Sequence, residues 1–180
     1  MSRIPALDPA TATGHVKELL DGVNKGLGAT PNLFRVAAQS PATLDALVGL
    51  FGALAKGKVD ARGREAIALA VSEFDGCDYC LSAHSALGKR AGLSEPDLAK
   101  ARDATAENPK LAAMLRFARQ VATERGHVAA QDLTAVRSGG VTDVEVLEIV
   151  ANVALTIFTN YLNEVAATDI DFPLVSHARR

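Results

Sequence analysis

The amino-acid sequence predicts an all-α protein, and three observations support this fold class. Apolar residues recur at intervals of three and four along most of the 180 residues, which is the spacing of one helix face. Capping residues precede these segments, and glycine or proline follows them. No segment alternates between apolar and polar residues as a half-buried strand does. With 48% apolar and 22% charged residues, the chain can build a full core.

The N-terminal part of the chain is expected to form an extended lead-in followed by three helices. Gly26 and Gly28 end the first helix. Ser40 caps the third, and Pro41 takes its first position, where the N–H that proline lacks would have no partner anyway. The expected ranges are 1–12 for the lead-in and 13–25, 30–37 and 41–55 for the helices.

Six further helices are expected after Gly57. Asp60 caps the first of these, Gly92 ends the second, and Asn108 followed by Pro109 begins the fourth. The expected ranges are 61–75, 77–91, 95–103, 109–125, 130–138 and 142–167, with an extended tail from 169 to 180.

The last of these helices, 142–167, begins with a capping box formed by Thr142 and Glu145. It is apolar on nearly all sides, which predicts burial in the core or in a subunit interface. We expect its one polar stripe to be a seam of interhelical hydrogen bonds, with the lining of a pocket as the alternative. The stripe consists of Glu145, Glu148, Asn152, Thr156, Asn160 and Asn163.

The overall composition excludes some classes of partner and compartment. The net charge of −2 gives no reason to expect nucleic acid or an anionic membrane as a partner. No apolar run reaches 18 residues, and the first residues lack the pattern of a signal peptide. We therefore expect a cytoplasmic protein, in which a C-x-x-C pair is more often catalytic or metal-binding than a structural disulfide.

The stretch 76–84 holds both cysteines of the chain. On a helix, Cys77, Cys80 and His84 lie at i, i+3 and i+7 and share one face. A helix beginning here, with Cys77 in its first turn, would stabilise a thiolate. Three interpretations are open: a redox dithiol, half of a zinc site, or two small buried residues. We favour the dithiol, because zinc normally takes four protein ligands and there is no second C-x-x-C pair.

The pattern around these residues resembles a known family. Eleven residues separate Glu65 from the C-x-x-C pair, and three residues separate the pair from His84. This spacing, on an all-helical chain, is similar to the alkylhydroperoxidase D-like branch of the carboxymuconolactone decarboxylase superfamily. Upstream features (Pro31-Asn32 and Ser40-Pro41) and the tail 171–173 resemble its peroxidase-related subset. The resemblance implies one AhpD-like domain over 1–180, with a helical N-terminal extension (1–57) and a core (58–180).

The resemblance also implies roles for these residues. Cys80 is similar to the cysteine that attacks the peroxide, Cys77 to the cysteine that resolves it, and Glu65 with His84 to a proton-relay pair. The implied partners are a hydroperoxide and a dithiol reductant, with no metal and no organic cofactor. Tyr79 stands where some members of the family have a second histidine, and tyrosine is a poor base near neutral pH.

Two alternatives remain beside a peroxidase: a lactone-directed lyase or isomerase of the same superfamily, and a redox sensor without enzymatic activity. Among other titratable residues, Glu73 is expected at the solvated surface, as are the remaining histidines: His15, His127 and His177. The broad apolar faces of helices 41–55 and 142–167 predict a homo-oligomer, and the resemblance implies a trimer or a hexamer.

Overall fold

The computed structural model describes residues 2–178 and contains nine α-helices and no strand within that range. The all-α prediction is therefore confirmed. The helices are α1 (Gly14–Leu27), α2 (Asn32–Ala37), α3 (Pro41–Leu54), α4 (Ala61–Asp75), α5 (Asp78–Arg90), α6 (Glu95–Arg102), α7 (Pro109–Thr123), α8 (Ala130–Ser138) and α9 (Asp143–Ala166).

Most helix boundaries follow from local capping, as the sequence predicts. Asp60 accepts a hydrogen bond from the backbone N–H of Gly63 at the start of α4. The capping box at the start of α9 is present, with Thr142 and Glu145 each accepting from the other's backbone N–H. The first helix differs from its prediction, because α1 continues through Gly26 and ends only where Gly28 adopts φ +78°.

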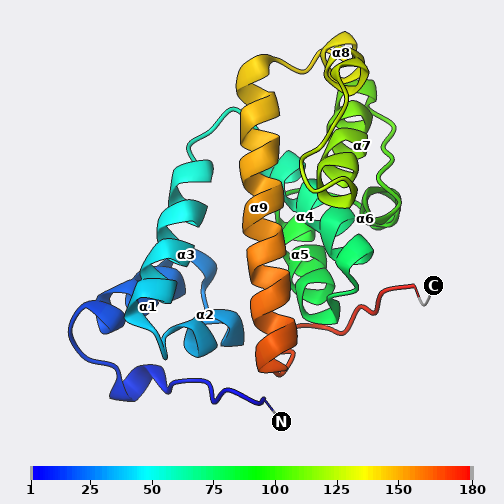
Figure 1. The fold of residues 1–180 in the computed structure, drawn as a ribbon. Coiled ribbons are helices and arrows are strands. Elements are labelled where there is room, and N and C mark those ends of the chain that lie inside the picture. Colours follow the sequence, from blue (N-terminus) through cyan, green and yellow to red (C-terminus); the bar gives the residue numbers. More distant parts are fainter. Residues whose placement is uncertain (1, 179–180) are drawn as a thin grey trace.

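Helix α9 runs through the middle of the molecule, with α1–α3 on one side and α4–α8 on the other (Figure 1). We call α1–α3 the N-terminal layer and α4–α9 the helical core. One cluster of buried apolar residues fills the space among α4, α6, α7, α8 and α9. A second cluster joins the N-terminal layer to α9 and to the start of α5, and it includes both cysteines. The single-domain division at residue 57 stays a prediction.

A short linker connects the N-terminal layer to the helical core. The carboxylate of Glu148 on α9 accepts hydrogen bonds from the backbone N–H groups of Lys58 (2.9 Å) and Val59 (2.8 Å). A Cβ at Gly57 would lie 2.6 Å from Oε2 of this carboxylate, so a larger residue there would require the Glu148 side chain to move. The linker is thus held at a fixed position against α9.

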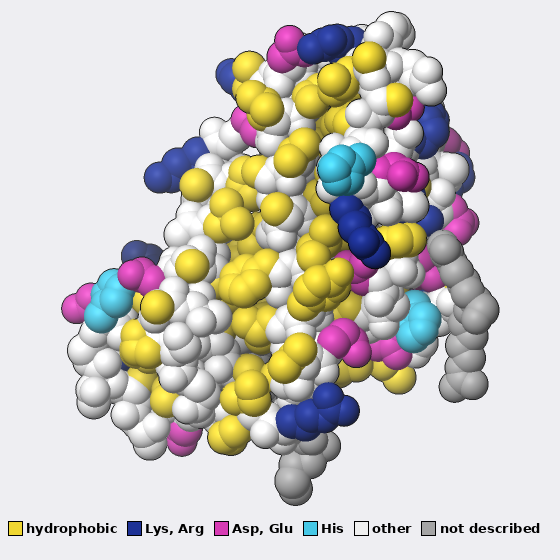
Figure 2. Space-filling model, in the orientation of Figure 1, with side chains coloured by type: hydrophobic (Ala, Val, Ile, Leu, Met, Phe, Trp, Pro, Cys, Tyr) yellow, Lys and Arg dark blue, Asp and Glu magenta, His cyan; other side chains and the backbone are white. Residues whose placement is uncertain are grey.

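Helix α9 has the length and apolar composition of a membrane-spanning helix, but half of the relevant window is buried inside the fold. It packs against α4, α7 and the N-terminal layer. Its outer face stays exposed and forms an apolar band along the molecule (Figure 2). We call this band the α9 stripe; its exposed large residues are Val144, Leu147, Val150, Tyr161 and Val165.

The extended tail, residues 168–178, folds back over the start of α5, and we call it the C-terminal strap. Ser82 accepts from the N–H of Val175 (2.9 Å), and His177 Nδ1 hydrogen-bonds to Asp78 (2.7 Å). The expectation that His177 is a surface residue is therefore wrong in part, because the ring is half-buried and bonded. His15 and His127 are exposed, as expected.

The expectation that Glu73 is solvated at the surface is also wrong. Its side chain is buried and forms an ion pair with Arg102 at 2.7 Å. It also accepts a hydrogen bond from the N–H of Ala178, so it fastens the end of the strap. No local pattern predicts this role, because Ala178 of the strap lies 105 residues after Glu73 in the chain.

Candidate active site

The two cysteines lie where α4 turns into α5. Gly76 ends α4 with φ +74°, a conformation that favours glycine, and its N–H donates to Ser72. The chain then turns at once into α5. Cys77 is the N-cap of that helix and Cys80 lies in its first turn, so the predicted start is correct to within one residue.

The two thiols are close, reduced and buried. The Sγ of Cys77 accepts a hydrogen bond from the backbone N–H of Cys80 at 3.3 Å. From α9, the amide of Asn163 donates to the Sγ of Cys80, also at 3.3 Å. Cys77 is fully buried and Cys80 is 2% exposed. The Cys80 thiol is therefore surrounded by donors, as a thiolate requires.

These surroundings move the pKa values of the two thiols in opposite directions. Burial alone would raise the pKa of Cys80, but the hydrogen bond from Cys77, the charge of His84 and bonds from Asn163 and Thr159 together lower it. The hydrogen bond to Cys80, followed by burial, raises the pKa of Cys77 far above its usual value. Within the pair, Cys80 is the sulfur that ionises first.

Glu65 on α4 and His84 on α5 form a partly buried pair, with 2.7 Å between Oε2 and Nδ1. A carboxylate only accepts, so Nδ1 carries the proton and Nε2 is left free to exchange one. Burial would lower the pKa of His84, but the charge and hydrogen bond of Glu65 raise it. The pair therefore favours the protonated imidazole of His84 near Cys80.

Tyr79 is part of the scaffold. Its hydroxyl donates to Asp171 of the strap (2.9 Å) and accepts from the backbone N–H of Leu33 in α2 (3.0 Å). Burial raises the pKa of Tyr79 well above its usual value, so the phenol stays protonated. One side chain thus joins α5 to the strap and to the N-terminal layer.

The four uncharged residues of the polar stripe of α9 fall into two groups. Asn160 and Asn163 bond across to α4 and α5, through Asp75, Ser72 and Cys80, as the predicted seam requires. Asn152 and Thr156 bond to carbonyls of α9 itself, so the seam prediction is wrong for them.

Both of these side chains line a small cavity of about 40 Å³ beside the Glu65–His84 pair. Thr159, which the sequence analysis missed, also lies at the site. In the sequence, the only feature that indicates a role for Thr159 is its position one residue from the polar stripe of α9.

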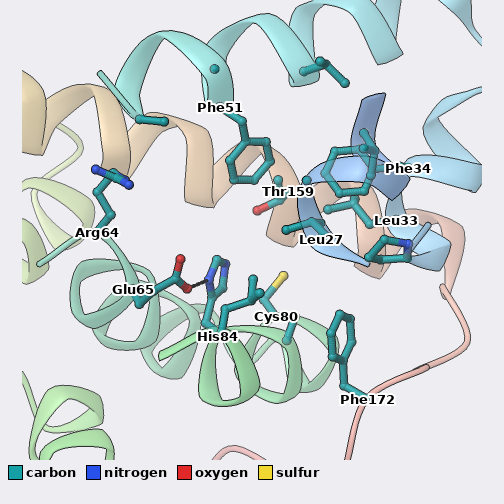
Figure 3. A pocket seen from close by; sticks show the side chains of 18 of the residues that line it. Leu27, Leu33, Phe34, Phe51, Arg64, Glu65, Cys80, His84, Thr159 and Phe172 are labelled. Carbon is teal, nitrogen blue, oxygen red and sulfur yellow. Dashed lines mark hydrogen bonds and ion pairs between the residues drawn. The ribbon is translucent and has the colours of Figure 1, made fainter. Parts of the chain in front are cut away.

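A larger cavity of about 390 Å³ opens onto Cys80 (Figure 3). Cys80, His84 and Glu65 lie on the core side of this cavity, whereas Leu33 and Phe51 come from the N-terminal layer opposite. Cys77 is not among the lining residues that the structure describes. The site therefore combines one accessible sulfur, a second sulfur behind it, an acid–base pair and an apolar chamber. Among residues 2–178, no group of three or more His, Cys, Asp or Glu side chains is arranged to hold a metal ion.

This arrangement defines a class of all-helical proteins with a dithiol at a helix start, and comparisons with known proteins agree. Residues 41–124 match the model of the Carboxymuconolactone decarboxylase family. No match was found among curated proteins. The chain resembles the solved alkylhydroperoxidase AhpD core, an uncharacterized peroxidase-related protein from Ralstonia eutropha JMP134, with 26% identity and a TM-score of 0.86. The match covers 94% of this chain and 92% of that one.

Two further solved structures share the fold. A peroxidase-related protein from Silicibacter sp. TM1040 has 22% identity and a TM-score of 0.79, covering 92% of this chain and 91% of that one. The debrominase Bmp8 in complex with 2,3,4-tribromopyrrole has 23% identity and a TM-score of 0.80, covering 93% and 91%. Residues 41–124 are thus similar to the carboxymuconolactone decarboxylase family, and the chain has the AhpD-like fold, in agreement with the resemblance. This similarity suggests an enzyme.

Proposed function

We propose that the protein is a thiol-dependent peroxidase that cycles Cys80 and Cys77 between dithiol and disulfide. The observation that carries the proposal is the place of Cys80 on the cavity wall, with Cys77 behind it and the Glu65–His84 pair beside it. Cys80 is the attacking cysteine, Cys77 the resolving cysteine, and Glu65 with His84 the proton relay. The steps need no metal and no organic cofactor.

In the first step, the Cys80 thiolate attacks the terminal oxygen of a hydroperoxide. An S–O bond forms as the O–O bond breaks, and the departing alkoxide takes a proton from the imidazolium of His84. The products are an alcohol and a sulfenic acid on Cys80. Sulfur loses two electrons and the peroxide gains them. Glu65 supports this transfer, because its carboxylate keeps His84 charged and oriented.

In the second step, the Cys77 sulfur attacks the sulfenic sulfur. A disulfide forms, and the hydroxyl group leaves as water with the proton of the Cys77 thiol. The raised pKa of Cys77 keeps that proton in place until this step. An external dithiol then reduces the disulfide and is itself oxidised. A compartment in which thiols are kept reduced, such as the cytoplasm, would supply it.

A single-turnover experiment without reductant tests the proposal. Reduced wild-type protein is expected to consume one equivalent of peroxide and to lose both thiols. Cys77→Ser should also consume one equivalent and leave a sulfenic acid that dimedone traps, whereas Cys80→Ser should consume none on the same timescale. Wild-type consumption no faster than that of free dithiothreitol would overturn the proposal and favour a redox sensor.

A second candidate is reductive dehalogenation of an aromatic ring, favoured by the aromatic residues that line the cavity. An aryl bromide and two thiols would give the arene, a disulfide and hydrogen bromide. The debrominase with this fold was solved with 2,3,4-tribromopyrrole. Bromide release from that compound, measured beside peroxide consumption, decides between the two reactions.

A further inference from the structure

The cavity at Cys80 is much larger than hydrogen peroxide requires. The volume of the cavity is about 390 Å³. A water molecule occupies about 30 Å³ in the liquid, so this volume equals that of roughly a dozen water molecules. The size lies within the range of sites for small organic molecules. A site for hydrogen peroxide alone would not need this chamber.

The walls of the cavity are divided by character. The reactive groups Cys80, His84 and Glu65 come from the helical core, and the opposite wall comes from the N-terminal layer. That wall is almost wholly apolar, with Val23, Leu27, Leu33, Phe34, Val48 and Phe51. A molecule with one small polar end and an apolar body fits this division, with its polar end at Cys80.

Aromatic side chains are concentrated around the cavity. The chain has only six phenylalanines and two tyrosines, and it has no tryptophan. Four of these eight line the cavity: Phe34, Phe51, Tyr79 and Phe172. Aromatic rings pack favourably edge to face or offset against another ring, which favours a ligand that carries one.

Three solvent-exposed glycines line the cavity. Gly22 and Gly26 in α1 and Gly52 in α3 line the cavity, and a Cβ at any of them would meet no atom within 4 Å. Their backbone lies outside the positive-φ region, so the conformation does not require glycine. Glycine is among the least favourable residues in a helix, and packing within the chain does not explain it here.

We propose that Gly22, Gly26 and Gly52 are specificity-determining residues, which leave room for a ring-bearing apolar hydroperoxide to reach Cys80. The chemistry of this inference rests on the proposed peroxidase function, but the binding does not. A larger side chain at these positions would occupy the space of the organic body and leave the reactive groups in place. Hydrogen peroxide, which has no such body, would still reach Cys80.

The test compares two leucine substitutions in the same helix, α3. Gly52→Leu fills the cavity. Gly49→Leu is the matched control, because Gly49 also has open space around its Cβ position but does not line the cavity. Both changes favour the helix, so circular dichroism and thermal unfolding should find both variants folded. Gly22→Leu repeats the test from the opposite helix, α1.

With cumene hydroperoxide, we expect Gly52→Leu and Gly22→Leu to lower kcat/KM by roughly tenfold or more. With hydrogen peroxide, the same variants should stay within about twofold of wild type, and Gly49→Leu should match wild type for both peroxides. Equal losses for the two peroxides, or equal behaviour of Gly52→Leu and Gly49→Leu, would overturn the inference.

A binding measurement separates this inference from the proposed function. The product alcohol, 2-phenylpropan-2-ol, is expected to bind the wild-type protein in calorimetry and to lose that binding in Gly52→Leu. If neither peroxide is consumed but the alcohol binds in this way, the size inference stands and the peroxidase proposal falls. If both peroxides are reduced and the alcohol binds equally to wild type and Gly52→Leu, the peroxidase proposal stands and the size inference falls.

Discussion

Across the cavity, the N-terminal layer presents Leu33, Phe34 and Phe51, whereas the helical core presents Cys80 and the Glu65–His84 pair. The first side is apolar and carries no acid–base group at the site. The second side holds the thiol whose pKa is lowered and the histidine whose pKa is raised. The two sides come from separate stretches of the chain, before and after residue 57.

The contrast predicts that changes in the two regions will have different kinetic signatures. Substitutions in the core should change the rate and the pH dependence for every peroxide, because they alter ionised groups. Substitutions in the N-terminal layer should change which molecule is accepted. Four sets of variants test this difference between the helical core and the N-terminal layer, from the largest expected effect to the smallest.

The largest loss is expected from Glu65→Gln. Without the carboxylate, the pKa of His84 falls, since burial is then no longer offset. The imidazolium is lost at a lower pH, so the alkaline limb of the activity profile should move to lower pH. The rate near neutral pH should fall by about 10²-fold or more, the usual range for a general acid. His127→Asn, at an exposed histidine, is the control; an unchanged alkaline limb in Glu65→Gln would remove the pair from the mechanism.

A smaller effect is expected from Asn163→Leu, which removes a donor to Cys80. A hydrogen bond to a charged group contributes about 1.5–3 kcal/mol, so alkylation of Cys80 near pH 6 should slow by roughly tenfold. Asn152→Leu makes the same change on the same helix, where the amide bonds only to a carbonyl of α9. If the two variants have identical alkylation profiles, Asn163 does not stabilise the thiolate.

Tyr79→Phe removes the hydroxyl that joins the helical core to the N-terminal layer and to the strap. It leaves the N–H of Leu33 and the carboxylate of Asp171 without this partner. We expect the free energy of unfolding to fall by about 1–3 kcal/mol, which lowers the melting temperature by roughly 2–10 °C. Tyr161→Phe, at the exposed tyrosine, should change it by no more than about 0.5 kcal/mol. A melting temperature of Tyr79→Phe equal to that of Tyr161→Phe would show that the junction adds no stability.

The smallest effect on a single chain is expected at the α9 stripe. We propose that a second copy of the chain covers this stripe in a homo-oligomer, because an exposed apolar band of this length is unusual in a monomer. The double variant Leu147→Lys/Val165→Lys should reduce the mass in light scattering to that of one 18.8 kDa chain. Leu174→Lys, on the strap, is the control. A wild-type mass of one chain at all concentrations would refute the oligomer.

The sequence predicted the helices well because their boundaries depend on nearby residues. The starts at Asp60, Asn108 and Thr142 are each set by a side chain bonded to an N–H three positions later. The dithiol was found for the same reason, because Cys77 and Cys80 are held at their spacing by one helix turn.

Long-range features were not predicted, because no local pattern encodes them. Glu73 resembles a solvated residue until the strap returns to it from about 100 residues away. The hydroxyl of Tyr79 finds both partners in segments that lie 46 and 92 residues away in the sequence. Which residues of the polar stripe of α9 form a seam and which line a cavity likewise depends on the helices that lie opposite.

The anchored linker at residues 57–59 has a practical consequence for protein engineering. Because Glu148 fixes the backbone N–H groups of Lys58 and Val59, the chain enters α4 from one defined point. A chimera that exchanges residues 1–57 with those of a relative would keep this entry point if glycine at 57 and glutamate at 148 are retained. Such a chimera would combine a different apolar cavity wall with the unchanged pair of Cys77 and Cys80.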